Sequence, residues 1–359
     1  AKLTDEVRVY LQENNIEVMD YECIFTVLAD IPEDKKILID EKENSFAIYS
    51  SVKNAQVVNK DDIIIKLKAV KNSVEIENIK KSHIKDGVAM VNFLHWFDTN
   101  IGKQKITEYD VSEKLKEYRL MQEHCLGPLF DTISGYNENA AMMHYIPTSE
   151  NHAVVGSRGV LLVDSGGQYL GGTTDITRTI VVNEVDEEQK RDFTLVLKAN
   201  IAMITTVFLE GSTGKTLDVI ARRYLWEHHL NYKCGSGHGI GYCLSVHEGP
   251  HGFGIDVPLK SGMLLTIEPG VYKEGRYGIR TENTVVVVED VFDEDAGQFY
   301  RFELLTYCPI DVRAIDVSLL DKKEINWLNE YHRKVYEVLS TYLGEEQKNW
   351  LKIMTQPIG

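Results

Sequence analysis

The chain has 359 residues, 43% of them hydrophobic and 26% charged, and its formal net charge is −16. This composition is that of a globular protein with ample material for a core, and the length predicts roughly two domains. Bulk charge of this sign disfavours binding to nucleic acid or to an anionic membrane. No apolar run approaches the roughly 18 residues that span a bilayer.

The cysteines indicate the compartment. The chain has five, an odd number, and no CxxC pair; they are Cys23, Cys125, Cys234, Cys243 and Cys308. In a chain of this length the pattern predicts free thiols, a reducing compartment and hence a cytoplasmic protein. No secretory signal opens the sequence, and the first residue is Ala1 rather than methionine. We therefore expect a piece of a longer protein, whose own N-terminal signal, if it has one, is not visible here.

The first 70 residues read as a small α/β piece. Leu3, Val7 and Leu11 recur at helical spacing, and the segments 36–40 and 46–49 read as two short strands. So few strands would make a poor independent domain. We interpret residues 1–70 as the end of a larger domain.

Residues 71–359 read as one α+β domain of catalytic size. The predicted elements are a long helix capped by Ser73, a helix over 111–123, glycine-punctuated strands from Pro128, helices over 186–209 and 217–230, and helix again in the last 45 residues. Within that last part, Asp321 and Glu324 form a capping-box pattern.

Three familiar motifs fail on physical grounds. Residues 211–216 end like a P-loop, but Leu209 replaces a required glycine and the preceding segment reads as helix, which favours a helix–helix turn. The alternating glycines of 235–241 never supply the last glycine of G-x-G-x-x-G, and they indicate backbone packed closely, with His238 at its centre. His247 and His251 match H-E-x-x-H, but Gly249-Pro250 between them would break the helix that zinc binding requires.

A different set of polar residues lies at strand ends or beside glycines. Asp164 ends the run 160–163, Asp175 follows eleven positions later, His238 lies between two glycines, Glu268 ends the run 264–267, and Glu282 precedes the run 285–288. One such acid usually faces solvent, as in an ordinary polar hairpin. Four carboxylates beside apolar strands would repel one another unless cations neutralise them. We therefore expect a metal site.

The arginine near the last carboxylate adds a detail. Arg280 and Glu282 stand at i and i+2, so on a strand they share a face. That spacing predicts that the arginine orients or balances the carboxylate.

These residues lie in long motifs: "DSGGQYLGGTTDITRT", "GSGHGIGYCLSVHEGP", "EPGVYKEGRYGIRTEN" and "MMHYIP". Over about residues 70–359 the sequence resembles the M24 "pita-bread" metallopeptidases, above all the three-domain aminopeptidases P (Xaa-Pro aminopeptidases). The resemblance implies an α+β fold, with a curved mixed or antiparallel sheet covered by helices and a C-terminal helical extension. It makes residues 1–70 the remnant of a creatinase-type second domain, with the first domain missing.

The resemblance also implies a two-metal centre, most often of Mn(II), with Zn, Co and Fe as alternatives. In it Asp175 and Glu282 bridge both ions, Asp164 completes one, and His238 with Glu268 completes the other. The remaining matches are listed by role: His144 and His247 hold substrate and stabilise the transition state, Arg280 supports the ligands and substrate, and Cys234 stands where relatives can carry a histidine.

The implied reaction is hydrolysis of the N-terminal Xaa-Pro bond by a hydroxide that bridges the two metals. We expect Glu268 to carry the proton to the leaving nitrogen and His247 to stabilise the oxyanion. The expected partners are peptides with proline in second position, with a homodimer as a further expectation. Two alternatives stay open: a prolidase restricted to dipeptides, and a catalytically weak module that binds peptides.

Overall fold

The structure is a computed structural model that describes residues 3–359. The chain divides into two compact units, with the boundary in sequence between Lys66 and Leu67. Among the described residues, no helix is both long enough and apolar enough to cross a membrane.

The first unit contains a two-stranded parallel sheet. Its elements are α1 (Asp5–Glu13), α2 (Cys23–Ala29), β1 (Lys36–Ile39), α3 (Phe46–Ser51), β2 (Gln56–Asn59) and the start of α4 (Ile63–Ala69), which crosses the unit boundary. The predicted first helix and first strand are confirmed, but the strand predicted over 46–49 is wrong. That segment is α3, and Ser45 caps it by accepting a hydrogen bond from the Ile48 amide. Because β1 and β2 run parallel, the chain between them must cross over, and a helix makes the crossing.

The second unit contains most of the regular structure. Its helices are α5 (Ser73–Asn100), α6 (Glu108–Leu120), α7 (Glu187–Ile204), α8 (Gly214–Trp226), α9 (Lys322–Leu339) and α10 (Glu345–Met354), with short 3₁₀ turns at Asn137–Ala141, Val312–Ala314, Val317–Leu319 and Ser340–Tyr342. Its strands are β3 (Cys125–Pro128), β4 (Ile133–Tyr136), β5 (Gly159–Ser165), β6 (Gly167–Tyr169), β7 (Gly172–Thr173), β8 (Ile176–Val182), β9 (Val207–Leu209), β10 (Leu264–Ile267), β11 (Gly270–Lys273), β12 (Tyr277–Arg280), β13 (Asn283–Asp293) and β14 (Gly297–Leu304).

Side-chain caps explain where several helices begin. The box predicted at Asp321 and Glu324 is confirmed at the start of α9. The long helix α5 is capped by Asn72 rather than by the predicted Ser73, because Asn72 and Glu75 form a reciprocal box. Helix α6 begins three residues earlier than predicted because Thr107 accepts a hydrogen bond from the Asp110 amide.

Antiparallel strands form the frame of the second unit. One sheet has the order β4-β5-β8 and another the order β10-β13-β14-β9, while β11 and β12 form a separate hairpin. The segment predicted to continue α7 to residue 209 instead ends in the edge strand β9, which pairs with β14. The turn at 211–216 therefore joins a strand to helix α8, not two helices; Leu209 still occupies the glycine position that a P-loop needs.

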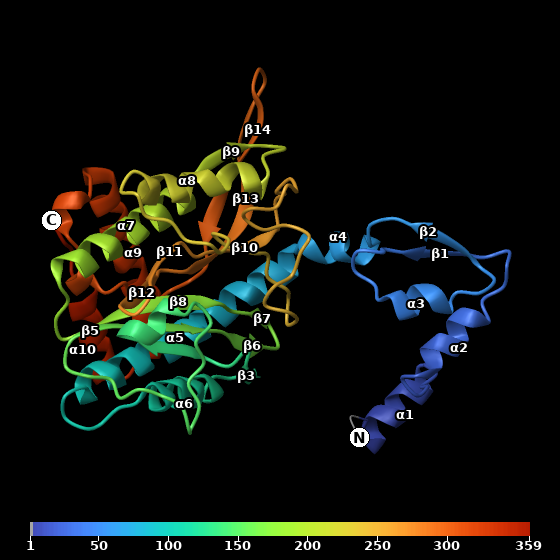
Figure 1. Cartoon of the computed structure of the whole chain (residues 1–359), viewed down its shortest axis with the longest axis horizontal. Coiled ribbons are helices and arrows are strands. Elements are labelled where there is room, and N and C mark those ends of the chain that lie inside the picture. The colour runs from blue at the N-terminus through green and yellow to red at the C-terminus, as the bar shows by residue number, and fades with distance from the viewer. Residues whose placement is uncertain (1–2) are drawn as a thin grey trace. The chain divides into compact units, whose positions relative to one another are not determined.

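Helices cover both faces of the β5–β8 pair. Leu161 and Val163 of β5 pack in one cluster with residues of α5 and α6, whereas Val160 packs in another with residues of α7 and α9. This is the alternation expected of a strand that is buried on both sides. Figure 1 shows α5 with α6 and α7 with α8 as two helical layers of this unit.

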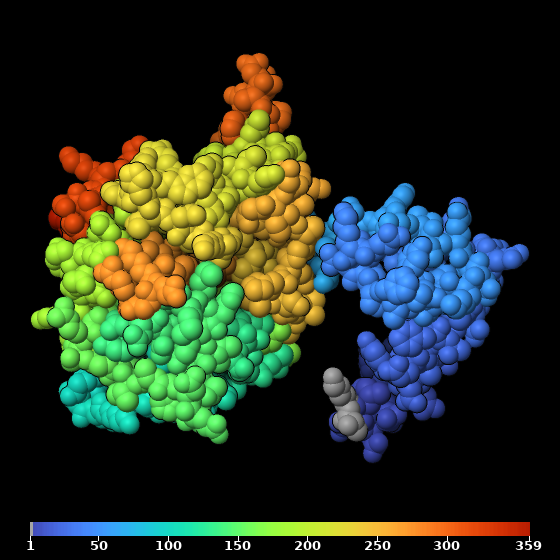
Figure 2. All heavy atoms as spheres, viewed as in Figure 1, coloured from blue at the N-terminus to red at the C-terminus, as the bar shows by residue number. Residues whose placement is uncertain are grey.

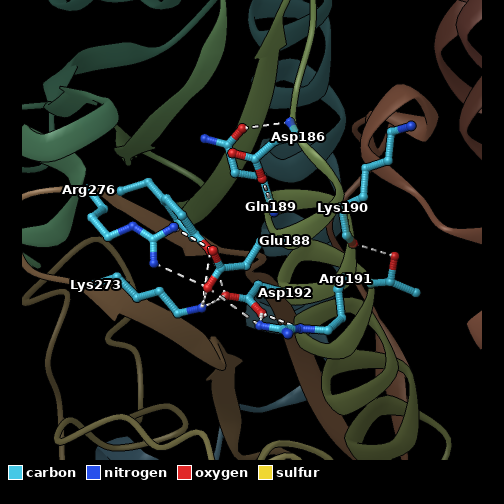
Figure 3. Close-up of polar contacts among 10 residues, drawn as sticks. Asp186, Glu188, Gln189, Lys190, Arg191, Asp192, Lys273 and Arg276 are labelled. Atoms are coloured by element: carbon cyan, nitrogen blue, oxygen red, sulfur yellow. Dashed lines mark hydrogen bonds and ion pairs between the residues drawn. The ribbon is translucent and has the colours of Figure 1, made fainter.

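Ion pairs tie the β11–β12 hairpin to the first turns of α7 (Figure 3). Lys273 contacts both Glu188, at 2.7 Å, and Asp192, at 2.5 Å. Arg276 pairs with Glu188. The Tyr277 hydroxyl donates to Asp192 at 2.8 Å. Because Asp192 is fully buried, these partners offset a large desolvation cost, and they fix the hairpin that ends at Arg280.

Candidate metal centre

Asp164 and Asp175 belong to neighbouring strands. Asp164 lies near the end of β5, opposite Thr177 of β8, and Asp175 immediately precedes β8. The intervening residues form β6 and β7, which pair with each other as a hairpin. The stretch is therefore a polar hairpin and also carries two of the candidate metal ligands. Asp164 is an even-numbered residue of β5, as is Val160, so both project to the face opposite that of Leu161 and Val163.

His238 is held in a tightly packed glycine loop. Its amide donates to the Thr266 hydroxyl at 3.0 Å, beside β10. Gly237 has φ +152°, and a Cβ there would lie 1.9 Å from the Thr266 carbonyl oxygen, so a larger residue cannot occupy the position. The Nδ1 atom lies 3.0 Å from the Gly239 carbonyl oxygen. Because a carbonyl can only accept, Nδ1 carries the proton and Nε2 faces the carboxylates.

The predicted ligands come together around this ring. His238 Nε2 lies 3.5 Å from Asp175 Oδ2 and 3.5 Å from Glu268 Oε1. Ligand atoms of Asp175, His238 and Glu282 all lie within 4.8 Å of one another. Asp164 and Glu268 line the same cavity as these three. The structure thus brings together all five residues singled out from the sequence.

Arg280 makes its direct ion pair with Asp164, at 2.5 Å, rather than with Glu282 as the i, i+2 spacing had predicted. Its Nε donates to the Thr177 hydroxyl at 3.0 Å, and that hydroxyl donates to Glu282 Oε2 at 2.7 Å. Strand β12 ends at Arg280, so Glu282 lies beyond the strand and the shared-face argument does not reach it. Thr177 supplies the link between arginine and glutamate that the sequence did not reveal.

The side chains fit a pair of hard cations. Among the described residues, Asp164 Oδ1 and Asp175 Oδ1 are buried without any hydrogen-bond partner. Buried carboxylate oxygens normally have donors, so two unpartnered ones on residues that line the same cavity call for positive charge. Four carboxylates and one imidazole are a donor set suited to Mn(II) and related ions.

The pKa values of these groups agree with that fit. Burial raises the pKa of Asp175 to about 7, against the opposing hydrogen bond from His238. Burial also raises the pKa of Glu268 and Glu282, and neighbouring carboxylates add to both shifts. A bound cation would reverse these effects by favouring the ionised forms.

The cluster lines a cavity of about 590 Å³, which His144 and His247 also line. The His238 and His247 rings meet edge to face, with centroids 4.1 Å apart. Burial and the neighbouring His238 lower the pKa of His247, which favours a neutral ring at physiological pH. Cys234 lies in the same wall, and burial raises the pKa of its thiol.

Several segments border this part of the surface. Figure 2 shows the loop over residues 142–153, in green, near the β11–β12 hairpin in orange and residues 241–256 in amber. Met143 comes from the first, Tyr272 from the second and Val246 from the third, and all three line the cavity. An elongated ligand entering here would therefore meet three separate chain segments.

His251 lies outside the group of residues that line the cavity. The segment 247–251 is not helical, and His251 is buried with Nε2 2.7 Å from the Leu264 carbonyl oxygen. Burial lowers its pKa to about 4. All five cysteines, which fall within the described residues, are free, as predicted.

The geometry can now be compared with known proteins. Residues 77–289 match metallopeptidase family M24, and residues 298–358 match the C-terminal region of peptidase M24. This chain belongs to metallopeptidase family M24. Residues 1–75 match the creatinase/prolidase N-terminal domain.

Curated relatives of this M24 chain are longer than it is. A probable Xaa-Pro aminopeptidase P of Laccaria bicolor is 38% identical, with 100% of this chain and 58% of the relative covered. Aminopeptidase P1 of Arabidopsis thaliana is 34% identical, with 99% and 64% covered. The M24 chain thus spans roughly three fifths of the length of these relatives.

Solved structures place the fold. An X-prolyl aminopeptidase from Caenorhabditis elegans, described as a cytosolic enzyme with a di-nuclear active site, superposes with a TM-score of 0.91 at 33% identity, covering 99% of this chain and 60% of that one. A Xaa-Pro dipeptidase from Bacillus anthracis superposes with a TM-score of 0.69 at 25% identity, covering 84% and 83%. The predicted α+β pita-bread fold is confirmed.

Proposed function

We propose that this chain contains the catalytic unit of a metal-dependent Xaa-Pro aminopeptidase, which removes the first residue of peptides whose second residue is proline. The observation that supports this most is the convergence of Asp164, Asp175, His238, Glu268 and Glu282 in one cavity with two further histidines. The names of the M24 relatives that match nearly the whole chain agree with it.

Each ligand has a proposed place. Asp175 and Glu282 would contact both ions, Asp164 one of them, and His238 with Glu268 the other, with Mn(II) as the proposed metal. Two such ions, when bound, supply an acidified water nucleophile and polarise the scissile carbonyl. Arg280 keeps Asp164 oriented, because its guanidinium is already committed to Asp164, Thr177 and the Tyr272 hydroxyl. Direct contact of Arg280 with substrate stays a prediction.

The remaining groups act on substrate and protons. His144 and His247 hold the peptide from two separate chain segments, and a neutral His247 donates a hydrogen bond to the developing oxyanion. Glu268, whose Oε1 accepts from the Thr266 hydroxyl at 3.1 Å, takes the proton of the attacking water and delivers it to the proline nitrogen. A Glu268→Gln protein that kept its metals and near-normal turnover would refute this proton transfer.

A ladder of peptides tests the proposed substrate. The purified chain, loaded with Mn(II), is offered Xaa-Pro, Xaa-Pro-Yaa and longer Xaa-Pro peptides, with Xaa-Ala-Yaa as the matched control. We expect cleavage of the tripeptide and longer peptides and none of the alanine series. Cleavage of the dipeptide alone would instead identify a prolidase, the alternative that the fold of the Bacillus dipeptidase keeps open.

Metal analysis separates an enzyme from a peptide-binding module. We expect the protein to bind close to two equivalents of Mn(II) and the activity to disappear on chelation and return on adding the ion back. A protein that bound peptides without metal, and showed no manganese-dependent cleavage, would be a binding module.

The setting of the protein is also proposed. We place it in the cytoplasm, as the worm relative is described, and propose peptides as its partners. We propose that residues 1–70 are the end of a creatinase-type domain, in keeping with the family match of residues 1–75. A homodimer remains part of the proposal, and the mass of the protein in solution tests it.

A further inference from the structure

A buried carboxylate outside the metal centre has an unusual number of donors. Glu108, in the first turn of α6, is fully buried. Its carboxylate accepts hydrogen bonds from the Tyr136 amide at 2.6 Å, the Asn139 side chain at 3.0 and 3.1 Å, the Tyr145 hydroxyl at 2.9 Å and the Ala153 amide at 2.6 Å. All four donor residues lie in the segment 136–153.

That segment forms one wall of the cavity. Met143, His144 and Ile146 line the cavity. Tyr145, between His144 and Ile146, donates its hydroxyl to Glu108. His144 therefore stands directly beside a residue that is tied to a fixed point of helix α6.

Within the segment itself the hydrogen bonds are short-range, such as those from the Tyr145 amide to the Met142 carbonyl at 3.0 Å and from the Thr148 amide to the Asn151 carbonyl at 2.9 Å. Between its 3₁₀ turn and Ala153 it forms no helix or strand. Met142 is 52% exposed and Ile146 44% exposed, so apolar burial contributes little there. By contrast, a buried carboxylate left without donors would be costly, and this cost favours the one arrangement in which all four donors reach it.

A second contact fixes the other side of His144. Arg280, which holds Asp164, also lies 3.4 Å from the Met143 carbonyl oxygen as a hydrogen-bond donor. The histidine is thus flanked by one residue tied to the metal centre and one tied to Glu108. The pKa of Tyr145 is raised to about 12, by burial first and then by Glu108, so the hydroxyl remains a donor across the usual assay range.

We propose that Glu108 is a positioning residue that fixes His144 at the cavity through the Tyr145 hydroxyl. This inference deepens the proposed function, on which its catalytic consequence rests. Glu108 does not touch the substrate; it sets where the imidazole of His144 can meet one.

The test removes the hydroxyl and little else. Tyr145→Phe keeps the ring and loses the bond to Glu108, and Tyr136→Phe is the matched control, since its hydroxyl bonds to the Arg158 carbonyl instead. We expect Tyr145→Phe to raise KM for a Xaa-Pro-Yaa peptide about tenfold, the usual scale for one hydrogen bond to a charged group, with metal content unchanged. Tyr136→Phe should change KM less than twofold.

A double-mutant cycle separates a specific effect on the position of His144 from a general loss of order in the segment 136–153. In a His144→Ala background, Tyr145→Phe should change KM by less than twofold, because the group it positions is gone. Additive effects of the two substitutions would overturn the proposal. Glu108→Gln should follow the same pattern as Tyr145→Phe if it folds.

A second measurement does not need activity. In protein with ¹³C-labelled histidine rings, the signal of His144 is assigned by its loss in His144→Ala. We expect Tyr145→Phe to shift or broaden that signal and Tyr136→Phe to leave it in place. An unchanged His144 signal in Tyr145→Phe would refute the positioning role. If the unaltered protein cleaved no Xaa-Pro peptide, the proposed function would fail, and this signal would still decide the role of Glu108.

Discussion

The metal-free protein should lose stability as pH rises, because its ligand carboxylates are buried close together. Burial raises the pKa of Asp175 from 3.8 to about 7, and Asp164 adds to the shift while His238 opposes it. A carboxyl group whose pKa is higher in the folded than in the unfolded state contributes stability that is present below pH 4 and lost as pH rises through 7. His238 acts in the same direction. Its burial lowers the pKa, but Asp175 and Glu268 together raise it to about 9, so its contribution is lost as pH rises from 6.5 through 9.

The size of the effect follows from the shift. For Asp175 the difference between about 7 and 3.8 is roughly 3 pKa units, or about 4 kcal/mol in total. More than half of that, roughly 2 to 3 kcal/mol, falls between pH 5 and 8. In a unit of this size it corresponds to a fall in Tm of roughly 5 °C.

Scanning calorimetry of chelator-treated protein at pH 5, 6, 7 and 8 measures this fall. Asp175→Asn is the control, because it removes the titrating carboxyl, and with it a contact that raises the pKa of His238, while it retains other pH-dependent groups, such as the buried His251 and His332. We expect the Tm of the unaltered protein to fall by at least about 5 °C more than that of Asp175→Asn over this range, and saturating Mn(II) to abolish the difference. Parallel curves for the two metal-free proteins would refute the reasoning.

Three further predictions concern single residues. Asp164→Ala and Asp175→Ala should each abolish metal-dependent cleavage while the far-ultraviolet circular dichroism stays near that of the parent; retained manganese-dependent activity in either would contradict the ligand assignment. Glu268→Gln, assayed beside metal analysis, should lower kcat at least a hundredfold even where manganese is retained. Arg178 is buried and donates to the Glu282 carbonyl at 2.6 Å and to several other acceptors, among them the Tyr331 hydroxyl. Arg178→Met should therefore lower the free energy of unfolding by about 3 kcal/mol or more, whereas Tyr331→Phe should lower it by about 1 kcal/mol. Urea midpoints measure both changes, and equal losses would mean that the acceptors around Arg178 find other donors.

Local sequence patterns were sufficient to predict the strands that border the candidate metal centre. The runs before Asp164 and Glu268 and the run after Glu282 are confirmed as β5, β10 and β13. In each case a short apolar run is bounded by a carboxylate, and burial of the run forces the carboxylate to the sheet end. The five candidate ligands line one cavity, and each is attached to or beside its own strand or glycine loop.

Elements whose structure depends on distant partners were predicted less well. Residues 46–49 are a short apolar run of the kind that a strand can contain, yet the parallel pairing of β1 with β2 requires a crossing there, and α3 forms. Val207–Leu209 continues a helical pattern, yet it pairs with β14 almost a hundred residues later. Thr177 links Arg280 to Glu282 only because β8 and β12 lie together in the fold.

The sequence does not distinguish a carboxylate that anchors a loop, such as Glu108, from one that could bind a metal, such as Asp175. Glu108 was overlooked because an acid in the first turn of a helix, after Thr107, is what an ordinary cap provides. Its four donor residues lie 28 to 45 positions away, beyond the reach of any local pattern.

In the fold, the number of donors separates the two kinds of buried carboxylate. Asp175 Oδ1 lies buried without a donor among the described residues, a costly arrangement that a cation relieves. Glu108 is buried more completely, yet both of its oxygens accept hydrogen bonds from the loop it anchors. A cation would have to displace those donors and release that loop. The unsatisfied carboxylate is therefore the one suited to a metal, and the satisfied one is suited to holding His144 in place.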